Sequence, residues 1–216
     1  MNTFKFLSFI LFAFLLFACE DEKIDVEKYG GITGTVLDAD DYTPLQGVQI
    51  VTNPASSVTI TGDNGAFDFL KVLEGEVAIS ARKKDYLSNS VSIAVYEGEV
   101  TNLTFFLLKD ENDVGWVEIY DPVPGNGAID QNISFTFQWQ VDLENTGNEL
   151  EYMVYFYESN STVQKIAGEN LTTTEVVVAG LDYNTTYYWY VVAKNEGKRV
   201  ANSPTWTFRT KASSDS

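Results

Sequence analysis

Apolar and polar residues alternate in short runs along most of the chain after residue 30, and turn-forming residues separate the runs. A period of two predicts β-strands that bury one face. No helix-length amphipathic stripe lies between the runs, which argues against alternating strands and helices. The pattern therefore predicts an all-β chain made of sandwiches. In the first half, the expected strands are Ile32–Val36, Val48–Ile50, Phe67–Phe69, Val77–Ala81, Val91–Val95 and Leu103–Leu108.

The second half repeats this organisation with more aromatic residues. Pro122 and Pro124 suit an edge or irregular first strand, because proline cannot donate to a sheet. The densest apolar stretch is Leu181–Ala193, and the tip at Lys198 and Arg199 reads as a solvated hairpin end. The other expected strands are Phe135–Trp139, Tyr152–Tyr157, Val176–Val178 and a last one at Trp206 and Phe208.

The N-terminus carries a different signal. Lys5 precedes an apolar block, Phe6–Ala18, and Cys19 follows it as the single cysteine of the chain. The block is shorter than the roughly 20 residues that a membrane-spanning helix needs, and it has the length of a secretory signal core. These residues resemble a bacterial lipoprotein signal, which implies that Cys19 is lipidated and anchors the protein. A plain secretion signal and a buried structural cysteine are the alternatives.

Acidic residues follow the cysteine directly, at Glu20, Asp21 and Glu22. This run resembles the export signal of Bacteroidota lipoproteins, which implies an outer-membrane protein that faces the cell exterior. Acids at this place also occur in lipoproteins retained at the inner membrane. A charged stretch of this kind is in any case a solvated, flexible tether.

Composition excludes several classes of function. The formal net charge is −17, and removal of residues 1–19 with Lys5 makes it −18. A surface this acidic repels phosphate backbones, so nucleic acid is not an expected partner. The chain has no histidine, which removes His-based nucleophile pairs and the usual zinc sites. We expect no cofactor, no catalytic residues and no enzyme activity.

The first half resembles the carboxypeptidase regulatory-like domain, a transthyretin-like sandwich. In place of the family's glycine before Tyr86, this chain has Asp85, which tolerates the left-handed backbone region. The family serves as a stalk, a folding aid or an appended module. The matching positions are Gly34, Val36, Asp38, Pro44–Val48, Thr61–Phe67, Gly75, Val77, Asp85 and Tyr86.

Four turn carboxylates of this half are candidates for a calcium site. Calcium prefers oxygen ligands from loops. The spacing does not fit an EF-hand loop, and Asp in turns commonly hydrogen-bonds its own backbone. We therefore expect no metal site and favour solvated turns. The four candidates are Asp38, Asp40, Asp41 and Asp63.

The last strand of the first half, Leu103–Leu108, is apolar on both faces. A strand with one solvated face would alternate, so its second face is expected to contact something. Trp116, just past the acidic linker, is the nearest candidate. We expect a small joint between Leu108 and Trp116, with the two domains end to end.

The second half resembles a fibronectin type III domain, an Ig-like sandwich. Trp139 matches the family's core tryptophan, and Tyr187 matches its tyrosine corner. Tyr183 stands in place of the customary proline. The remaining matches lie at Leu181, Thr185, Val191 and Ala193.

Alternation in the two central strands of this half predicts a candidate ligand site. If Tyr187 and Trp189 point into the core, the side chains between them point outward. Exposed aromatic patches often mark binding sites, and tyrosine suits contact with sugars or proteins. Two alternatives stay open: the rings pair across strands and only stabilise the sheet, or the first domain covers them. The predicted tyrosine face consists of Met153, Tyr155, Tyr157, Tyr188 and Tyr190.

The sequence thus predicts two tandem β-sandwich domains behind a lipoprotein signal. The favoured function is a cell-surface lipoprotein that acts as a non-catalytic binding or adhesion module. Its expected partners are the membrane, through the anchor, and a glycan or surface protein, with a link to polysaccharide uptake. The alternative is a purely structural stalk or assembly subunit of an outer-membrane complex. The expected segments are a signal peptide (1–18), lipidated Cys and tether (19–29), first domain (30–109), linker (110–116), second domain (117–211) and disordered tail (212–216).

Overall fold

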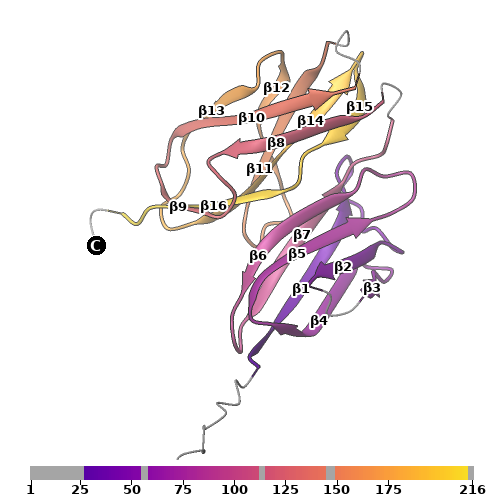
Figure 1. Cartoon of the computed structure of the whole chain (residues 1–216), viewed down its shortest axis with the longest axis vertical. Helices are drawn as coiled ribbons and strands as arrows, with labels where there is room; N and C mark the ends of the chain where they lie inside the picture. Colours follow the sequence, from indigo (N-terminus) through magenta and orange to yellow (C-terminus); the bar gives the residue numbers. More distant parts are fainter. Residues whose placement is uncertain (1–26, 55–57, 112–114, 145–148, 214–216) are drawn as a thin grey trace, which may run out of the picture.

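The computed structural model describes residues 27–54, 58–111, 115–144 and 149–213, which form sixteen β-strands and no helix (Figure 1). The all-β prediction is confirmed. Within these ranges, no helix is long and apolar enough to cross a bilayer. Cys19 and the acidic residues Glu20, Asp21 and Glu22 lie outside the described residues.

The first domain is a sandwich of two sheets. One sheet has the order β4-β1-β7, in which β1 runs antiparallel to β4 and parallel to β7. The other has the order β3-β2-β5-β6, with all neighbours antiparallel. The strands are β1 (Tyr29–Asp38), β2 (Gln49–Asn53), β3 (Val58–Ile60), β4 (Ala66–Leu73), β5 (Gly75–Arg82), β6 (Asn89–Val95) and β7 (Val100–Leu107).

The second domain is also a two-sheet sandwich. Its smaller sheet has the order β13-β10-β8. The larger has the order β12-β11-β14-β16-β9, and β15 pairs with β14. The strands are β8 (Val117–Val123), β9 (Ala128–Gln131), β10 (Phe135–Leu143), β11 (Glu151–Glu158), β12 (Lys165–Leu171), β13 (Glu175–Val178), β14 (Thr186–Asn195), β15 (Lys198–Asn202) and β16 (Trp206–Thr210).

Every strand expected from alternation is present, and four further strands are not foreseen by it. β3 and β9 have only three and four residues, too few to show a period. β12 contains Gly168 and buries none of its residues fully, so it lacks the contrast between two faces on which the prediction depends. β15 begins with Lys198 and Arg199. These two charged residues interrupt the apolar pattern, although Val200 and Ala201 of the same strand are buried.

Two tight turns of the first domain need a left-handed backbone. Gly65 has a φ of +70°, and a Cβ there would lie 2.5 Å from the carbonyl oxygen of Val36. Only glycine fits such a close approach. Asp85 has a φ of +67°, so the family's glycine position is filled by a residue that tolerates this conformation, as expected.

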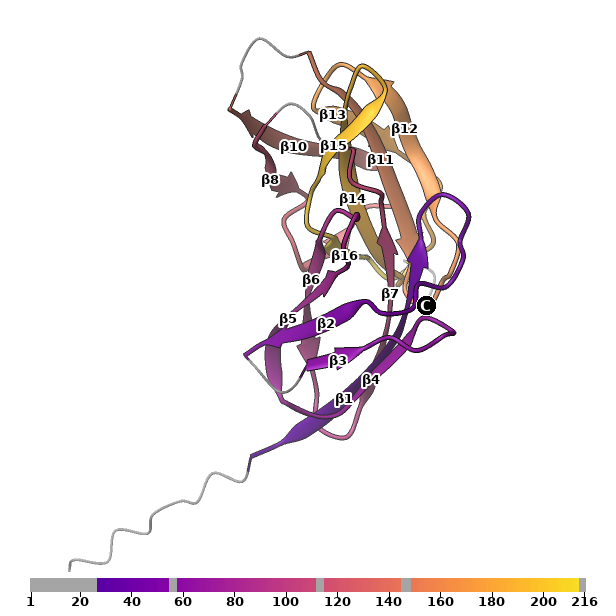
Figure 2. The same ribbon diagram turned by 90° about the vertical axis from the view of Figure 1, so that its right-hand side faces the viewer.

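The first strand, β1, begins at the end of the first domain that is remote from the second domain (Figures 1 and 2). The second domain lies against the outer face of β7 and the edge strand β6. The domains are therefore not joined only at the linker. They share a side-to-side contact.

Candidate functional site: the junction between the two domains

The tyrosine face points away from the core of the second domain, as the alternation predicts. Tyr187 and Trp189 lie in that core, and their neighbour Tyr188 belongs to the other side of the sheet. The prediction that this face is exposed is wrong. Tyr157, Tyr188 and Tyr190 are 3%, 5% and 0% exposed, and Met153 and Tyr155 are partly buried. The first domain covers them, so a free ligand cannot reach these side chains while the domains are in contact.

The cover is the outer face of β7. The Phe106 ring meets the Tyr157 ring edge-on, with centroids 5.0 Å apart. The Tyr157 hydroxyl donates to the carbonyl oxygen of Thr104 at 2.9 Å. The expectation that β7 contacts something with both faces is confirmed, but the partner is not Trp116. That side chain is 54% exposed and belongs to neither core, so the predicted joint between Leu108 and Trp116 is wrong.

Within the tyrosine face, rings pair across β11 and β14. Tyr155 stacks on Tyr190 at 5.2 Å and Tyr157 on Tyr188 at 5.4 Å, both nearly parallel. Each such cross-strand pair contributes about 0.2–1 kcal/mol. Burial raises the pKa of Tyr157 and Tyr190 well above the ordinary value. The phenols are therefore neutral hydrogen-bond donors inside the junction and have no acid–base role near neutral pH.

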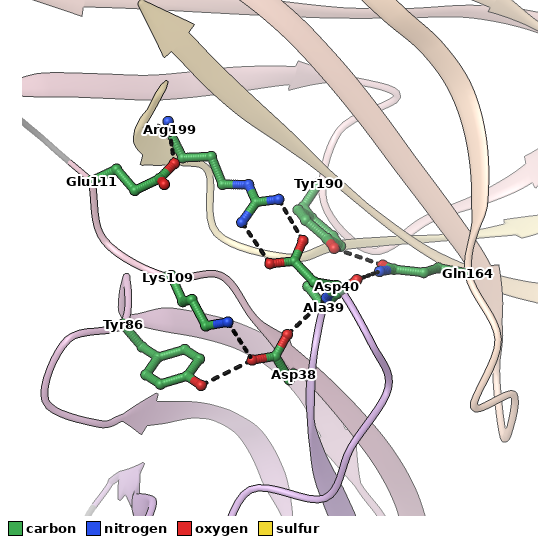
Figure 3. Close-up of polar contacts among 9 residues, drawn as sticks. All are labelled: Asp38, Ala39, Asp40, Tyr86, Lys109, Glu111, Gln164, Tyr190 and Arg199. Carbon is green, nitrogen blue, oxygen red and sulfur yellow. Dashed lines mark hydrogen bonds and ion pairs between the residues drawn. The ribbon is translucent and has the colours of Figure 1, made fainter. Parts of the chain in front are cut away.

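A buried glutamine extends this contact to the β1–β2 loop. The Tyr190 hydroxyl donates to Oε1 of Gln164 at 2.6 Å. The amide nitrogen of Gln164 donates to the carbonyl oxygen of Ala39 at 3.4 Å (Figure 3). Gln164 is 7% exposed, so both ends of its amide are used where water is largely excluded.

An ion pair also joins the two domains, beside Gln164. Two nitrogens of Arg199 donate to the two carboxylate oxygens of Asp40, one of them at 2.9 Å. The Arg199 backbone N–H also donates to Oε2 of Glu111 at 3.1 Å (Figure 3). The hydrogen bond to Asp40 raises the pKa of Arg199. The interpretation of this tip as a solvated hairpin end is wrong, because Arg199 bridges the two domains.

The opposite side of the junction is formed by Thr205 and the edge strand β6. The Thr205 backbone N–H donates to the carbonyl oxygen of Ser90 at 2.7 Å, and its hydroxyl donates to Oδ1 of Asn89 at 2.9 Å. Thr205 also pairs with Val91 as an isolated parallel bridge. Asn202 donates to the carbonyl oxygen of Ser88 at 3.3 Å. These contacts hold the domains together at a second place, separate from the ion pair.

An open groove of about 720 Å³ lies beside this second contact. Both domains line it: Ser90, Val91 and Ser92 come from β6, and the rest comes from the second domain. A smaller hollow of about 330 Å³ adjoins it along β8 and includes Trp116. The two share Asp121, Pro204 and Trp206. We call them together the junction groove.

Comparisons with known families identify both domains. The model of the carboxypeptidase regulatory-like domain matches residues 31–108, and that of the fibronectin type III domain matches residues 124–209. The chain is a carboxypeptidase regulatory-like domain followed by a fibronectin type III domain. Both are β-sandwich folds that serve in binding or structure. No curated protein matches the sequence.

Solved structures of low identity align with the chain. One is a protein of Bacteroides uniformis, provisionally named as carbohydrate-binding (10% identity, 83% of this chain and 98% of that one, TM-score 0.30). Others are the Bacillus anthracis TIE protein (15%, 86% and 32%, TM-score 0.34) and the FN1–FN3 domains of chicken CNTN1 (14%, 87% and 66%, TM-score 0.37). The assignment of the domains rests on the family matches.

The fibronectin type III domain keeps its tyrosine corner. The Asp182 backbone N–H donates to the Tyr187 hydroxyl oxygen at 3.0 Å. Tyr183, in the place of the customary proline, is 43% exposed and does not prevent the corner. Trp139 is buried in the core, as expected.

The carboxypeptidase regulatory-like domain does not bring the four calcium candidates together. Asp38 is 3% exposed and accepts from the Tyr86 hydroxyl at 2.9 Å, with Lys109 3.8 Å away (Figure 3). Burial, then the hydrogen bond to Asp38, raises the pKa of Tyr86 to about 12. Each of the other three has its own partner: Arg199 for Asp40, Thr43 for Asp41 and Gln46 for Asp63. Within the described ranges, no group of three acidic, His or Cys residues could hold a metal ion.

Proposed function

We propose that this protein is a lipid-anchored, non-catalytic surface protein whose two domains act as one rigid spacer. The observation that carries this proposal is the buried tyrosine face. Aromatic rings that the sequence would leave to solvent are packed against β7 and hydrogen-bonded to it through Tyr157. A contact with this burial and two separate polar edges limits hinge motion between neighbouring domains.

The direction of the chain supports a spacer. The anchor expected at Cys19 lies ten residues before Tyr29, the first residue of β1. Ten residues span at most about 35 Å when fully extended. Because β1 begins at the end remote from the fibronectin type III domain, the carboxypeptidase regulatory-like domain would be next to the membrane (Figure 1). The fibronectin type III domain would then be held outward at a fixed orientation.

The test uses the full chain and a Cys19→Ala variant expressed in a bacterium of the Bacteroidota. Wild type is expected in the outer-membrane fraction, with a fatty-acid label incorporated, and sensitive to protease added to intact cells. The variant is expected to lose the label and leave the membrane. If the variant stays in the membrane, or if wild type takes up no fatty-acid label, the anchor is excluded. If wild type carries the label but resists the protease, the surface location is excluded and the anchor is not.

A second candidate function is adhesion or binding to a glycan or protein partner. The tyrosine face no longer supports it, because that face is covered. The junction groove supports it instead, since it is open and lined by both domains.

A further inference from the structure

We propose that the junction groove is a binding site for a neutral glycan. This rests on the second candidate function, for which it names the ligand class, and it goes beyond the spacer function, because a spacer needs no ligand. It also does not depend on the lipid anchor. The groove has the shape, the aromatic and polar lining and the charge that such a ligand requires, and its free strand edge is unsuited to a peptide.

The groove is open and consists of two adjoining parts, which suits a chain of sugars rather than a small compact molecule. Its larger part, about 720 Å³, lies between β6 and the segment from Asp121 to Asn126. Its smaller part, about 330 Å³, follows β8 toward Trp116. Ligand sites are typically concave, with aromatic surface and a few well-placed polar groups.

Two tryptophans supply the aromatic surface. Trp116 is 54% exposed at one end of the groove, and its backbone is fixed by a pair of hydrogen bonds with Glu144. Trp206 is buried but lines both parts of the groove. An exposed tryptophan held by its backbone offers a flat apolar platform at low entropic cost, which is the surface that a sugar ring stacks on.

Side chains that exchange hydrogen bonds with hydroxyl groups complete the lining. Ser90 and Ser92 come from one domain, and Asn126 and Gln140 from the other. The Asn126 amide oxygen is used inside the protein, where it accepts from the Thr207 backbone N–H at 2.9 Å. This bond fixes the orientation of the Asn126 amide beside the groove.

The charge of the lining selects against acidic ligands. Asp121 lines both parts and Glu118 the smaller one, while no Lys or Arg is among their lining residues. An anionic sugar or phosphate would meet like charge at close range without a cation to pair with. Carboxylates accept hydrogen bonds from neutral sugar hydroxyls, so the same residues favour an uncharged glycan.

The free edge of β8 is unsuited to an extended peptide. Within the described residues, β8 pairs only with β10. Asp121 has a φ of +48°, which bends the strand, and Pro122 and Pro124 cannot donate a backbone hydrogen bond. Such features block the addition of a strand from a partner.

Three of the four tryptophans lie in the fibronectin type III domain and the fourth, Trp116, directly precedes its first strand, which makes a residue-specific test available. The full chain is labelled with 5-fluorotryptophan and kept in a zwitterionic detergent that contains no sugar. ¹⁹F NMR then follows titration with cellohexaose, maltohexaose, xylohexaose, mannohexaose and, as the acidic probe, hexagalacturonate. Trp116 and Trp206 report on the groove, and Trp189, which is fully buried and lines neither part of it, is the internal control.

At least one neutral hexasaccharide is expected to shift the Trp116 and Trp206 signals saturably, and by more than the Trp189 signal. Trp116→Ala and Gln140→Ala should each weaken that binding about tenfold or more, as loss of a central contact of about 1.4 kcal/mol does. For Trp116→Ala the Trp206 signal is followed. Tyr96→Ala, which removes an aromatic side chain that is 56% exposed on the other domain, is the matched control and should bind as wild type.

Several results would overturn the proposal. They are no shift with any neutral hexasaccharide, equal binding of hexagalacturonate, a common shift of all four signals, or unchanged binding by both groove variants. None of these results bears on the anchor at Cys19, which fractionation tests separately.

Discussion

The two faces of the β11–β14 pair have similar aromatic content but different surroundings. The inner face packs Trp189 and Tyr187 into the core of the fibronectin type III domain, where the indole N–H groups of Trp139 and Trp189 find no hydrogen-bond partner in the described structure. On the outer face, the hydroxyls of Tyr157 and Tyr190 both donate hydrogen bonds. Apart from the hydrogen bond that the Tyr187 hydroxyl accepts from the Asp182 backbone N–H, the inner face is held by shape and burial. The outer face forms an interface in which both of these polar tips have an acceptor, which fixes one orientation of the domains.

The largest expected effect comes from the inner face. Trp189→Ala leaves a cavity beneath the stacked Phe137 ring, 4.2 Å away in wild type. It should lower the free energy of unfolding of the fibronectin type III domain by about 3–5 kcal/mol. Urea unfolding followed by tyrosine fluorescence measures it. Trp116→Ala is the control, since a half-exposed side chain should cost about 0.5 kcal/mol or less. Equal losses for the two variants would mean that Trp189 is not a core residue.

Alkaline pH should act on the outer face next. Burial raises the pKa of Tyr157, Tyr188 and Tyr190 in the folded protein. A raised folded pKa gives stability that is fully present below the unfolded value near 10 and is lost as pH rises above it. Each buried tyrosine should therefore destabilise the folded protein progressively as the pH rises above 10.

The measurement is thermal unfolding between pH 7 and 12, with tyrosinate absorbance recorded alongside. The contribution of the buried tyrosines to the stability should stay constant up to pH 10 and then fall. Their phenols should ionise only together with the loss of structure. Independent ionisation of all tyrosines near pH 10, with the fold intact, would show that the face is open to solvent.

A smaller effect is expected from a single hydroxyl. Tyr157→Phe keeps the ring against Phe106 and Tyr188 but leaves the Thr104 carbonyl oxygen without its donor. Loss of one partner of a buried hydrogen bond costs about 1–3 kcal/mol. Chemical unfolding measures the cost, and Tyr96→Phe, at an exposed site, should show none. A variant as stable as wild type would remove this hydrogen bond from the account.

The smallest effect should come from the ion pair. Asp40→Asn removes the charge opposite Arg199, at a site where the Asp40 side chain is 39% exposed. Such pairs contribute about 0.2–1 kcal/mol, and salt screens them. The difference in Tm from wild type should therefore shrink in high salt. Lys28→Gln breaks the exposed ion pair with Glu97 inside the first domain, and it serves as the control for an ion pair that does not join the two domains. A difference that grows with salt would contradict an ionic origin.

The sequence predicts the strands and the side of the sheet on which each tyrosine lies, because alternation is a local property of the backbone. It leaves open what covers the tyrosine face, with cover by the first domain as one of two alternatives, because the outcome depends on the docking of two domains; the structure confirms that alternative. One signal was available. β7 buries the side chains on both of its faces from Leu103 to Leu107, and the tyrosine face needed a cover, so the two surfaces match in chemistry.

The polar residues of the junction could not be found in the same way. Asn89, Gln164 and Thr205 are buried and hydrogen-bond across the junction, and no neighbouring residues in the sequence form a pattern with them. Arg199 was the exception, since a basic tip on so acidic a chain suggests a carboxylate partner. The junction groove depends on side chains from both domains, so no segment by itself could indicate it.

The central claim is that the tyrosine face joins the two domains into one rigid body. ¹⁵N relaxation of residues 20–216, with the amides of each domain fitted separately, tests it most directly. Both domains should show the same rotational diffusion tensor, as for a single particle. Two shorter and different correlation times would mean that the domains tumble independently and that the tyrosine face is free in solution.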